Sequence, residues 1–299
     1  MLTACCLKFE KVTTEALAEI APYFGDEGAT ISDHSALYLH MWGEMLGTEY
    51  AIGDGVLYLR RNGKNGISYY PPLQKGAATL EAGLSHLSAL CEARVRLCAV
   101  PQSAVEMIEK NAHVIEKGTS RRWADYIYSA TDLATLKGHR YNKKRNLVHQ
   151  FERLYPTHTY EELGETNIKE VIDFMHRFMA ETEQNEDKRY ENERVLHILE
   201  EYRSLPAVGG LVRVDGEIAA FTVGELVGET LLVHVEKAHR RFKGAYQYIN
   251  YRFVGEQLKS HAFSFVNRED DAGDEGLRHA KLSYFPVDIL HKYYMILEI

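Results

Sequence analysis

A run of positively charged residues in the middle of the chain is the first pattern that could carry chemistry. Lys143, Lys144 and Arg145, followed by Asn146, open a predicted helix. The dipole of a helix disfavours cations at its start unless something negative lies nearby. A phosphate-rich ligand would supply that charge, and so would an acidic neighbour within the protein. The four residues are candidates for substrate binding, with a solvated basic surface as the alternative.

A second group of charges lies near the C-terminal end. Arg278 and Lys281 are three residues apart on a predicted helix and so share one face. Asp270 and Asp271 lie just upstream. A positive pair beside an acidic pair could hold an amino acid by its carboxylate and its amine, or align a transferred aminoacyl group. Two ordinary salt bridges would use the same spacing, so both interpretations of these four residues stay open.

The elements that would position these residues recur in the same order in both halves of the chain. Each half is predicted to run helix, helix, three antiparallel strands, helix, strand, helix, strand. In the first half, Thr13 or Thr14 caps the first helix, Asp54-Gly55 forms a hairpin turn, Pro101 starts a helix, and residues 123–129 close the set as an extended run.

The second half repeats this order without a clear residue-level repeat. Asn167 is predicted to cap its first helix, Asp215-Gly216 and Gly228 to form turns, and residues 291–299 to form its last strand. The order predicts an α/β (α+β) fold in which helices pack on mixed sheets.

Length and charge limit the classes of protein to consider. The 299 residues favour two domains of about 100 to 200 residues each. We expect an N-terminal domain over residues 1–160, which includes the basic run, and a C-terminal domain over 161–299 that bears the site. The net charge of −8 argues against a protein that coats nucleic acid non-specifically, and we expect no DNA partner, because such binding depends on neutralising many phosphates at once.

The cysteines and the apolar segments give no sign of export or of a metal. Cys5, Cys6, Cys91 and Cys98 match no zinc or redox spacing, so we expect reduced, mostly buried thiols and no metal site. The N-terminal residues lack the pattern of a signal peptide. No stretch approaches the roughly 20 apolar residues of a membrane span. These features predict a cytoplasmic protein.

Two segments resemble a known family. Residues 125–156 carry a tyrosine, then Asp132-Leu133, then Gly138, then the Lys144-Arg145-Asn146 run, and residues 266–286 read VNREDDAGDEGLRHAKLSYFP. Both are similar to the C-terminal domain of phosphatidylglycerol lysyltransferases, a family with the tandem acyl-CoA N-acyltransferase (GNAT) fold. The resemblance implies two GNAT-like domains in tandem, each a mixed sheet flanked by helices. Lipid-modifying members usually carry a transmembrane half, which this sequence does not predict.

The GNAT resemblance implies a place for the donor before the main helix of the second half. There, Arg241, Gly244 and Ala245 partly match the family's loop of a basic residue followed by glycines, which holds the pyrophosphate of coenzyme A. Tyr246 stands where the last small residue of that loop is expected. A solvated basic turn is the alternative. Acyl-CoA and aminoacyl-tRNA both remain possible donors.

Transfer of an acyl group needs an acceptor amine made neutral before attack, and a carboxylate acting through water can do this. Glu225 and Glu236, on the predicted central strands of the second half, are the candidates for this base. Tyr246, with Tyr248 and Tyr251 on the same helix, could protonate a leaving group. The alternatives are surface ion pairs for the glutamates and a core stripe for the tyrosines.

These patterns support two hypotheses. The first is an aminoacyl or acyl transferase acting on an amine or hydroxyl acceptor. The second is a non-catalytic module that keeps the GNAT fold and binds a ligand or partner. Within the first, a basic channel lined by Lys143, Arg145, Arg278 and Lys281 would indicate tRNA, and an open cleft between the fourth and fifth strands of the second half would indicate coenzyme A.

Overall fold

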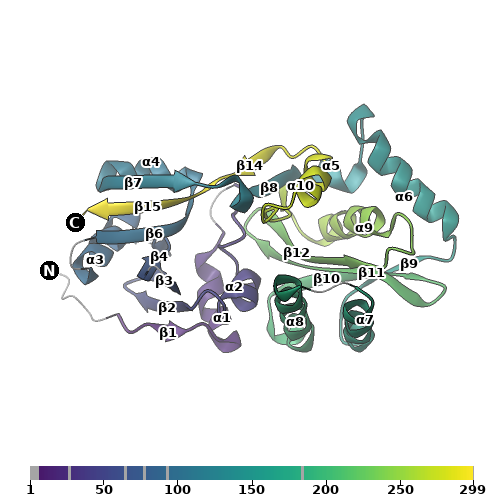
Figure 1. Ribbon diagram of the computed structural model, residues 1–299, viewed down its shortest axis with the longest axis horizontal. Helices are drawn as coiled ribbons and strands as arrows, with labels where there is room; N and C mark the ends of the chain where they lie inside the picture. The colour runs from purple at the N-terminus through teal and green to yellow at the C-terminus, as the bar shows by residue number, and fades with distance from the viewer. Residues whose placement is uncertain are drawn as a thin grey trace.

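The fold consists of two mixed sheets that lie side by side along the long axis of the molecule, each flanked by helices (Figure 1). It is given by a computed structural model, which describes residues 7–25, 28–63, 66–76, 79–91, 94–182 and 185–298. Cys5 and Cys6 lie outside the described residues. The tandem arrangement of mixed sheets flanked by helices is the predicted fold class.

The first sheet is built mainly from the N-terminal part of the chain. In spatial order its strands are β1 (Glu10–Lys11), β2 (Thr48–Gly53), β3 (Val56–Gly63), β4 (Gly66–Tyr69), β6 (Arg94–Pro101), β15 (Lys292–Glu298) and β7 (His113–Thr119), with β5 (Leu73–Gln74) paired to β3. Its helices are α1 (Thr14–Ile20), α2 (Ala36–Trp42), α3 (Leu80–Leu90) and α4 (Gln102–Asn111).

The second sheet has the matching order. Its strands are β14 (Asp288–Leu290), β8 (Asp125–Ser129), β13 (Phe265–Asn267), β12 (Thr230–Ala238), β11 (Glu217–Val227), β10 (Ala207–Val214) and β9 (Thr159–Glu162). Its helices are α5 (Ala130–Thr135), α6 (Asn142–Leu154), α7 (Ile168–Glu181), α8 (Glu186–Glu200), α9 (Ala245–Ser260) and α10 (Glu275–Leu282). Helices α7 and α8 cover one face of this sheet and α9 covers the other (Figure 1).

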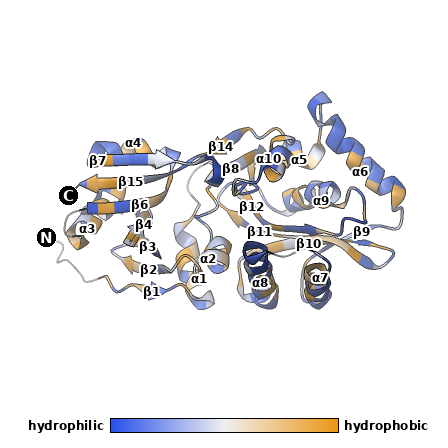
Figure 2. Cartoon of the chain, in the orientation of Figure 1, coloured by the Kyte–Doolittle hydropathy of each residue, from blue (hydrophilic) through white to orange (hydrophobic). Residues whose placement is uncertain are grey.

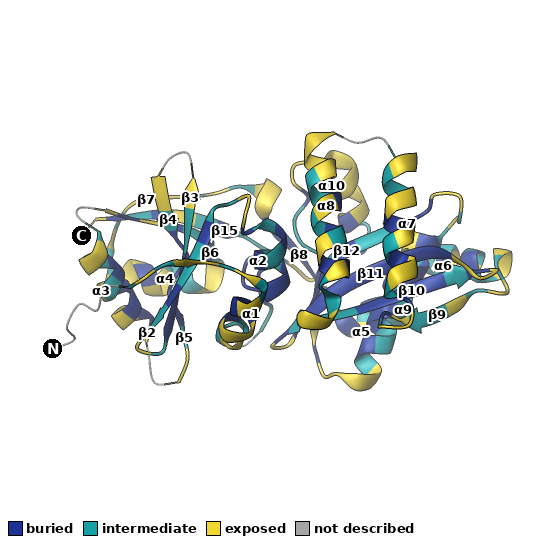
Figure 3. Ribbon diagram, turned by 90° about the horizontal axis from the view of Figure 1, so that it is seen from below, coloured by how far each residue is buried: buried dark blue, intermediate teal, exposed yellow. Residues whose placement is uncertain are grey.

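The apolar core explains these layers. The central strands β10, β11 and β12 are buried almost throughout, whereas α7 and α8 expose their outer faces (Figure 3). One core cluster joins residues of α1 and α2 to residues of α7, α8 and β11, including Leu39, Phe174 and Phe221. The two sheets therefore share apolar burial, which is the main force that holds α2 against α8.

The two sheets exchange their last strands. Strand β8, which directly follows the first sheet's elements in the chain, lies between β13 and β14 of the second sheet, and the C-terminal strand β15 lies between β6 and β7 of the first. The expectations that residues 123–129 close the first set and that 291–299 close the second are therefore wrong. Alternation of apolar residues predicts a strand but not its partner. Division of the chain at residue 160 stays a prediction.

Most of the predicted local signals are confirmed. The Thr13 side chain caps α1, and Pro101 immediately precedes α4. Asp54-Gly55 and Asp215-Gly216 adopt positive φ angles of 51° and 75°, and of 50° and 84°, in hairpin turns. Asn167 differs from the prediction. Its side-chain oxygen Oδ1 accepts a hydrogen bond from the Gly164 N–H at 2.9 Å. Because the preceding turn engages this oxygen, the side chain does not cap α7.

Short 3₁₀ segments connect these elements at Ala21–Tyr23, Arg121–Trp123, His139–Tyr141 and Tyr202–Ser204. Cys91 follows α3 and Cys98 lies in β6, and both are free and partly buried. Among the helices of the described ranges, none combines the length and apolarity needed to cross a bilayer.

Candidate functional site

The candidate site lies where the backbone pairing between two parallel strands ends, a place called the opening below. Strand β12 pairs with β13 only from Thr230 to Leu232, opposite Phe265 to Asn267. Beyond this point β12 contains a bulge, because Val223 and Gly224 of β11 pair with Val235 and Val233 and leave His234 without a partner. A bulge bends its strand and redirects the extra side chain. Backbone pairing between the two strands therefore ends before His234 and Glu236, whose side chains contact Glu269 and Arg268 just past β13.

Gly224 makes the bulge possible. A Cβ atom at this position would lie 2.3 Å from the carbonyl oxygen of Leu232, closer than any side chain tolerates. The glycine lets β11 approach β12 where the register shifts. A glycine inside an otherwise apolar strand is a local sequence signal of a bulge, although we did not assign it that role from the sequence.

His234 lies between two carboxylates. Its Nδ1 atom is 2.8 Å from Oε1 of Glu269, and its Nε2 atom is 3.7 Å from Oε2 of Glu225. Burial alone would lower the pKa of this fully buried imidazole, but interactions with the two carboxylates raise it to about 9. His234 is therefore a cation at neutral pH.

Glu225, one of the two predicted bases, joins the sheets. Its Oε1 accepts from the Ala36 N–H at 3.1 Å and its Oε2 from the Leu37 N–H at 2.8 Å. These are unpaired N–H groups of the first turn of α2, so this carboxylate of the second sheet caps a helix of the first. With both oxygens engaged and His234 beside it, Glu225 can hold α2 and the imidazole in position.

Glu236, the other predicted base, lies on the α9 side of β12. Arg268 Nη2 donates to its Oε1 at 3.1 Å, and Asn250 Nδ2 donates to its Oε2 at 3.2 Å. Burial of the ring and the Glu236 carboxylate both raise the pKa of Tyr246. The structure thus brings two of the three predicted catalytic residues, Glu236 and Tyr246, close to each other.

Lys144 is the one residue of the basic run that reaches this opening. Its ammonium lies 4.0 Å from the ring centroid of Tyr284, and the Arg268 guanidinium lies 5.0 Å from the same centroid. Burial, together with the charge of Arg268, lowers the pKa of Lys144 to about 8. Within the part of the chain that the structure describes, Lys144 forms no ion pair. Lys144 and Arg268 thus both lie against the ring of Tyr284, and Arg268 also binds Glu236.

The other three residues of the run lie elsewhere. Arg145 donates to the carbonyl oxygens of Leu136 and Gly138 and so stabilises the turn after α5. Lys143 and Asn146 are exposed on the outer face of α6 and line a shallow hollow of about 580 Å³. Helix α6 is largely hydrophilic along this face (Figure 2).

The predicted C-terminal charges form one connected arrangement around residues 268–274. Arg278 donates to both oxygens of Asp271 at 2.8 and 2.9 Å, and this contact holds the pKa of Asp271 well below its usual range. Lys281 Nζ donates to the carbonyl oxygens of Arg268, at 2.5 Å, and of Asp270, and burial lowers its pKa to about 8. Asp270 Oδ1 accepts from the Ala272 N–H at 2.8 Å, so all four groups bind one another or the backbone, and burial raises the pKa of Asp270 to about 6.

The predicted donor loop lies under α6. Arg241 forms an ion pair with Glu217, and Tyr155 accepts a hydrogen bond from the Lys243 N–H at 3.1 Å. Gly244 has φ of 90°, and a Cβ there would lie 2.8 Å from the carbonyl oxygen of Leu147. The Ala245 N–H donates to the Phe242 carbonyl oxygen at 3.1 Å. Helix α6 packs against the backbone at the position where the resemblance implied a pyrophosphate.

A buried polar network holds the end of β13. Lys292 Nζ lies 2.6 Å from Asp33 Oδ2, 2.8 Å from Asp125 Oδ1 and 2.9 Å from Ser32 Oγ. Asn267, the last residue of β13, donates to Asp125 Oδ2 at 2.9 Å. All five side chains are at least nine-tenths buried, so the network fixes the strand at the point where the opening begins.

Several site residues were not singled out from the sequence. Arg268 and Glu269 lie near the start of the segment 266–286, and Tyr284 lies near its end. Spacing alone gave these residues no role. His234 interrupts the apolar run from Leu231 to Val235, which is a signal that could have identified it. Within the described ranges, no group of three or more histidines, cysteines, aspartates or glutamates is arranged to hold a metal ion.

Comparison with known proteins agrees with this architecture. The model of the family "Phosphatidylglycerol lysyltransferase, C-terminal" matches residues 27–296, which is most of the chain and includes both sheets. The chain belongs to this family. Its fold, two GNAT-like mixed sheets in tandem, is the one that the resemblance implied.

Solved structures similar to this chain differ in how close they are. A conserved protein of unknown function from Bacteroides thetaiotaomicron is 30% identical, with 97% of this chain and 99% of that chain covered and a TM-score of 0.87. L-PGS from Bacillus licheniformis is 12% identical, with 96% and 92% covered and a TM-score of 0.64. FemX is 10% identical, with 98% and 97% covered and a TM-score of 0.57. The last two likenesses concern the fold alone.

One curated relative also matches part of the chain. An uncharacterised protein of Mycoplasmoides gallisepticum is 24% identical over 176 residues, which are 56% of this chain and 54% of that protein. The chain thus spans about half the length of the curated relative it matches. The family model thus shows a lysyltransferase-like domain, and the solved structures agree with it in fold.

Proposed function

We propose that this chain is an aminoacyl or acyl transferase whose reaction takes place in the opening between β12 and β13. The observation that carries the proposal is the pair of cations, Lys144 and Arg268, on the ring of Tyr284 beside Glu236. An unpaired, half-buried ammonium with a pKa of about 8 is suited to proton transfer near neutral pH.

Each group then has a part in the reaction. The amine or hydroxyl of the acceptor attacks the acyl carbonyl carbon, and its proton passes through water to the Glu236 carboxylate. Arg268 and Lys144 stabilise the negative charge that develops on the carbonyl oxygen. The bond from the carbonyl carbon to the donor then breaks, and the leaving oxygen or sulfur takes the proton of Lys144. His234, Glu225 and Glu269 keep the bulge in position.

We favour aminoacyl-tRNA over acyl-CoA as the donor. Helix α6 and Tyr155 pack on the 241–245 loop, which leaves its backbone less open to a pyrophosphate. The exposed face of α6 instead presents Lys143, His149 and Arg153 close to Lys144, and such a face suits a long phosphate backbone. The opening between β12 and β13 is the feature expected for coenzyme A, and we give more weight to the packing of α6 on the 241–245 loop; a cytoplasmic location is part of the same proposal.

The deciding experiment measures loss of the acyl group from a donor when enzyme is in excess. Purified chain is mixed with a charged tRNA pool, or with acetyl-CoA, in the presence of a panel of amines and glycerol derivatives. We expect acceptor-dependent deacylation of tRNA that is lost in Lys144→Met. Transfer from acetyl-CoA alone would replace the donor proposal with the acyl-CoA alternative. Saturable tRNA binding without transfer to any acceptor would favour the non-catalytic binding module and overturn the proposal.

A further inference from the structure

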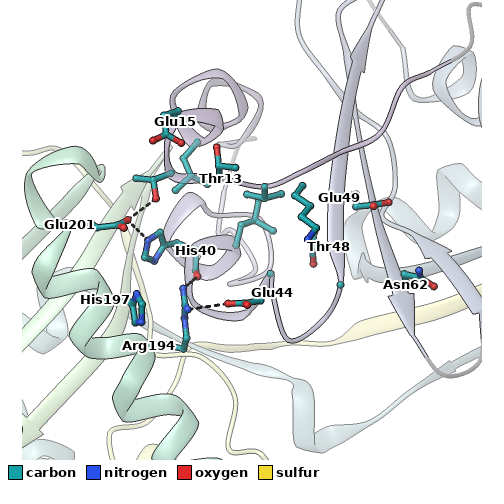
Figure 4. Close-up of a pocket in the computed structure, with 17 residues that line it drawn as sticks. Thr13, Glu15, His40, Glu44, Thr48, Glu49, Asn62, Arg194, His197 and Glu201 are labelled. Atoms are coloured by element: carbon teal, nitrogen blue, oxygen red, sulfur yellow. Dashed lines mark hydrogen bonds and ion pairs between the residues drawn. The ribbon is translucent and has the colours of Figure 1, made fainter.

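The start of α6 is held differently from the ends of α2. A carboxylate of the second sheet caps the first turn of α2, and near its other end His40 Nε2 lies 2.8 Å from Glu201 Oε2 at the border of a hollow of about 640 Å³ (Figure 4). Helix α6 lies at the outer end of the second sheet (Figure 1), and its middle packs on α9, where the ring of Phe151 stacks on Tyr248 at 4.6 Å. Lys144 lies in the first turn of α6, before this core contact, so its ammonium needs a separate contact to hold it.

Two consecutive aromatic residues after α10 contact the start of α6. The ring centroid of Tyr284, whose side chain is buried, lies 4.0 Å from the Lys144 ammonium. The ring of Phe285 packs edge-on against Tyr141, with centroids 5.6 Å apart and planes at 87°. Tyr141 directly precedes α6 and lies about one helical turn before Lys144. The two rings therefore contact neighbouring turns at the start of the same helix.

Phe285 presents its ring through an unusual backbone conformation. Its φ angle is 55°, in the left-handed region that bulky residues rarely adopt. Its N–H donates to the Leu282 carbonyl oxygen at 2.9 Å, and the Val287 N–H donates to the Ile127 carbonyl oxygen at 2.8 Å, so the turn is fixed on both sides. Glycine or asparagine would adopt this angle with less strain. Phe285 is also 40% exposed, so neither the backbone nor core burial explains a phenylalanine here, whereas the contact with Tyr141 does.

An arginine completes the same contact. The Arg140 guanidinium lies 4.9 Å from the ring centroid of Tyr141 and 5.8 Å from that of Phe285. Arg140 also forms an ion pair of 2.6 Å with Asp132 of α5, and the Tyr141 hydroxyl donates to the same carboxylate at 3.3 Å. A cation over an aromatic ring is attracted to it, so this cluster joins the turn after α10 to α5 and to the start of α6.

We propose that Phe285 is a positioning residue for Lys144. Its ring docks the start of α6 on the turn after α10, and this keeps the Lys144 ammonium against Tyr284, where Arg268 also lies. Phe285 acts through these contacts and does not itself bind donor or acceptor. The inference rests on the proposed function for the part that Lys144 plays in transfer, but the position of Lys144 can be measured without either substrate.

The experiment measures the pKa of the Lys144 amine by competitive labelling. Trace acetic anhydride is added to the full chain at a series of pH values, and mass spectrometry of peptides gives the extent of acetylation at each lysine. Only the neutral amine reacts, so the pH of half-maximal labelling gives the pKa of that lysine whatever its accessibility. For Lys144 we expect this point at about pH 8 in the unmodified protein.

Two substitutions keep the turn and remove the ring. Phe285→Gly and Phe285→Asn both tolerate the positive φ angle. In each we expect half-maximal labelling of Lys144 to move to about pH 9 or higher, towards the roughly 10.4 of an exposed lysine, because the released ammonium regains water. Phe285→Tyr keeps the ring and should retain the value of about 8. Leu282→Ala is the matched control, because Leu282 is also 40% exposed and ends α10, and it should leave the labelling of Lys144 unchanged.

Three results would overturn this inference. One is half-maximal labelling of Lys144 that stays at about pH 8 in Phe285→Gly and Phe285→Asn. Another is a value near that of an exposed lysine, roughly 10.4, in the unmodified protein, which would mean that Tyr284 does not hold the ammonium. The third is an equal change in Leu282→Ala, which would indicate general loosening of α10. Transfer that survives Lys144→Met would exclude the proposed reaction and leave the labelling result intact, so the two failures are distinguishable.

Discussion

The Nζ atom of Lys292 lies 2.8 Å from Oδ1 of Asp125, and these residues begin the two strands that the sheets exchange. Lys292 starts β15 in the first sheet and Asp125 starts β8 in the second. Asp33 accepts from the same ammonium at 2.6 Å. One buried ion pair thus ties the exchanged strands together next to the end of β13, where the candidate site opens.

Removing this cation should destabilise the whole fold. We expect Lys292→Met to lower the free energy of unfolding by about 3–5 kcal/mol, because two buried carboxylates lose their shared partner. Urea unfolding followed by circular dichroism measures the change. Lys110→Met, which breaks an exposed pair with Glu106, is the control and should change stability by less than about 0.5 kcal/mol. A loss of similar size in both variants would contradict a structural role for the buried pair.

Stability should fall as the pH rises through the titration of His234. Its pKa is raised to about 9 in the folded protein, against about 6.5 in an unfolded chain. A raised pKa means that the folded state binds the proton more tightly, so this contribution is complete below pH 6.5 and lost by about pH 9. We expect a loss of up to about 3 kcal/mol across this window, measured by urea unfolding at several pH values. In His234→Gln the decline should be largely absent, and an unchanged decline would exclude His234 as its source.

Two neighbouring lysines should behave differently in transfer. Lys144→Met should slow acyl transfer by about 100-fold or more, because the leaving atom loses its proton donor. In the unmodified protein the rate should decline above pH 8, the pKa of Lys144, and this limb should vanish in the variant. Lys143→Met should only weaken donor binding in a salt-dependent way, since Lys143 is exposed on α6. Single-turnover deacylation gives both quantities, and equal effects of the two substitutions would argue against a proton donor at Lys144.

The bulge should depend on the glycine opposite it. Gly224→Ala places a methyl group 2.3 Å from the Leu232 carbonyl oxygen, so we expect a loss of about 1–3 kcal/mol in the free energy of unfolding. Gly164→Ala is the matched control, because nothing lies within 4 Å of its new methyl group, and it should be close to neutral. Chemical denaturation compares the two. A neutral Gly224→Ala would mean that β11 can move away from β12 without cost.

The sequence predicted which segments contribute to the candidate site better than which of their side chains reach it. Residues 143–146 were predicted as one substrate-binding group, yet in the structure only Lys144 approaches Arg268 and Tyr284, while Arg145 binds the turn after α5. Helical spacing fixes which side chains share a face but not which neighbour that face meets. Glu236 and Tyr246 were named separately and lie near each other, because β12 packs against α9.

The sequence by itself determined most of the helices and strands in their order, but not β7 and β9, together with the hairpin turns at Asp54-Gly55 and Asp215-Gly216 and the family. These follow from local backbone preferences and from motifs within short segments. Only the tertiary structure decided that β8 and β15 change sheets, that Glu225 caps α2, and that His234 is charged between Glu225 and Glu269. Each of these depends on contacts between residues far apart in the chain, where burial and electrostatic pairing, and not the local pattern, select the partner.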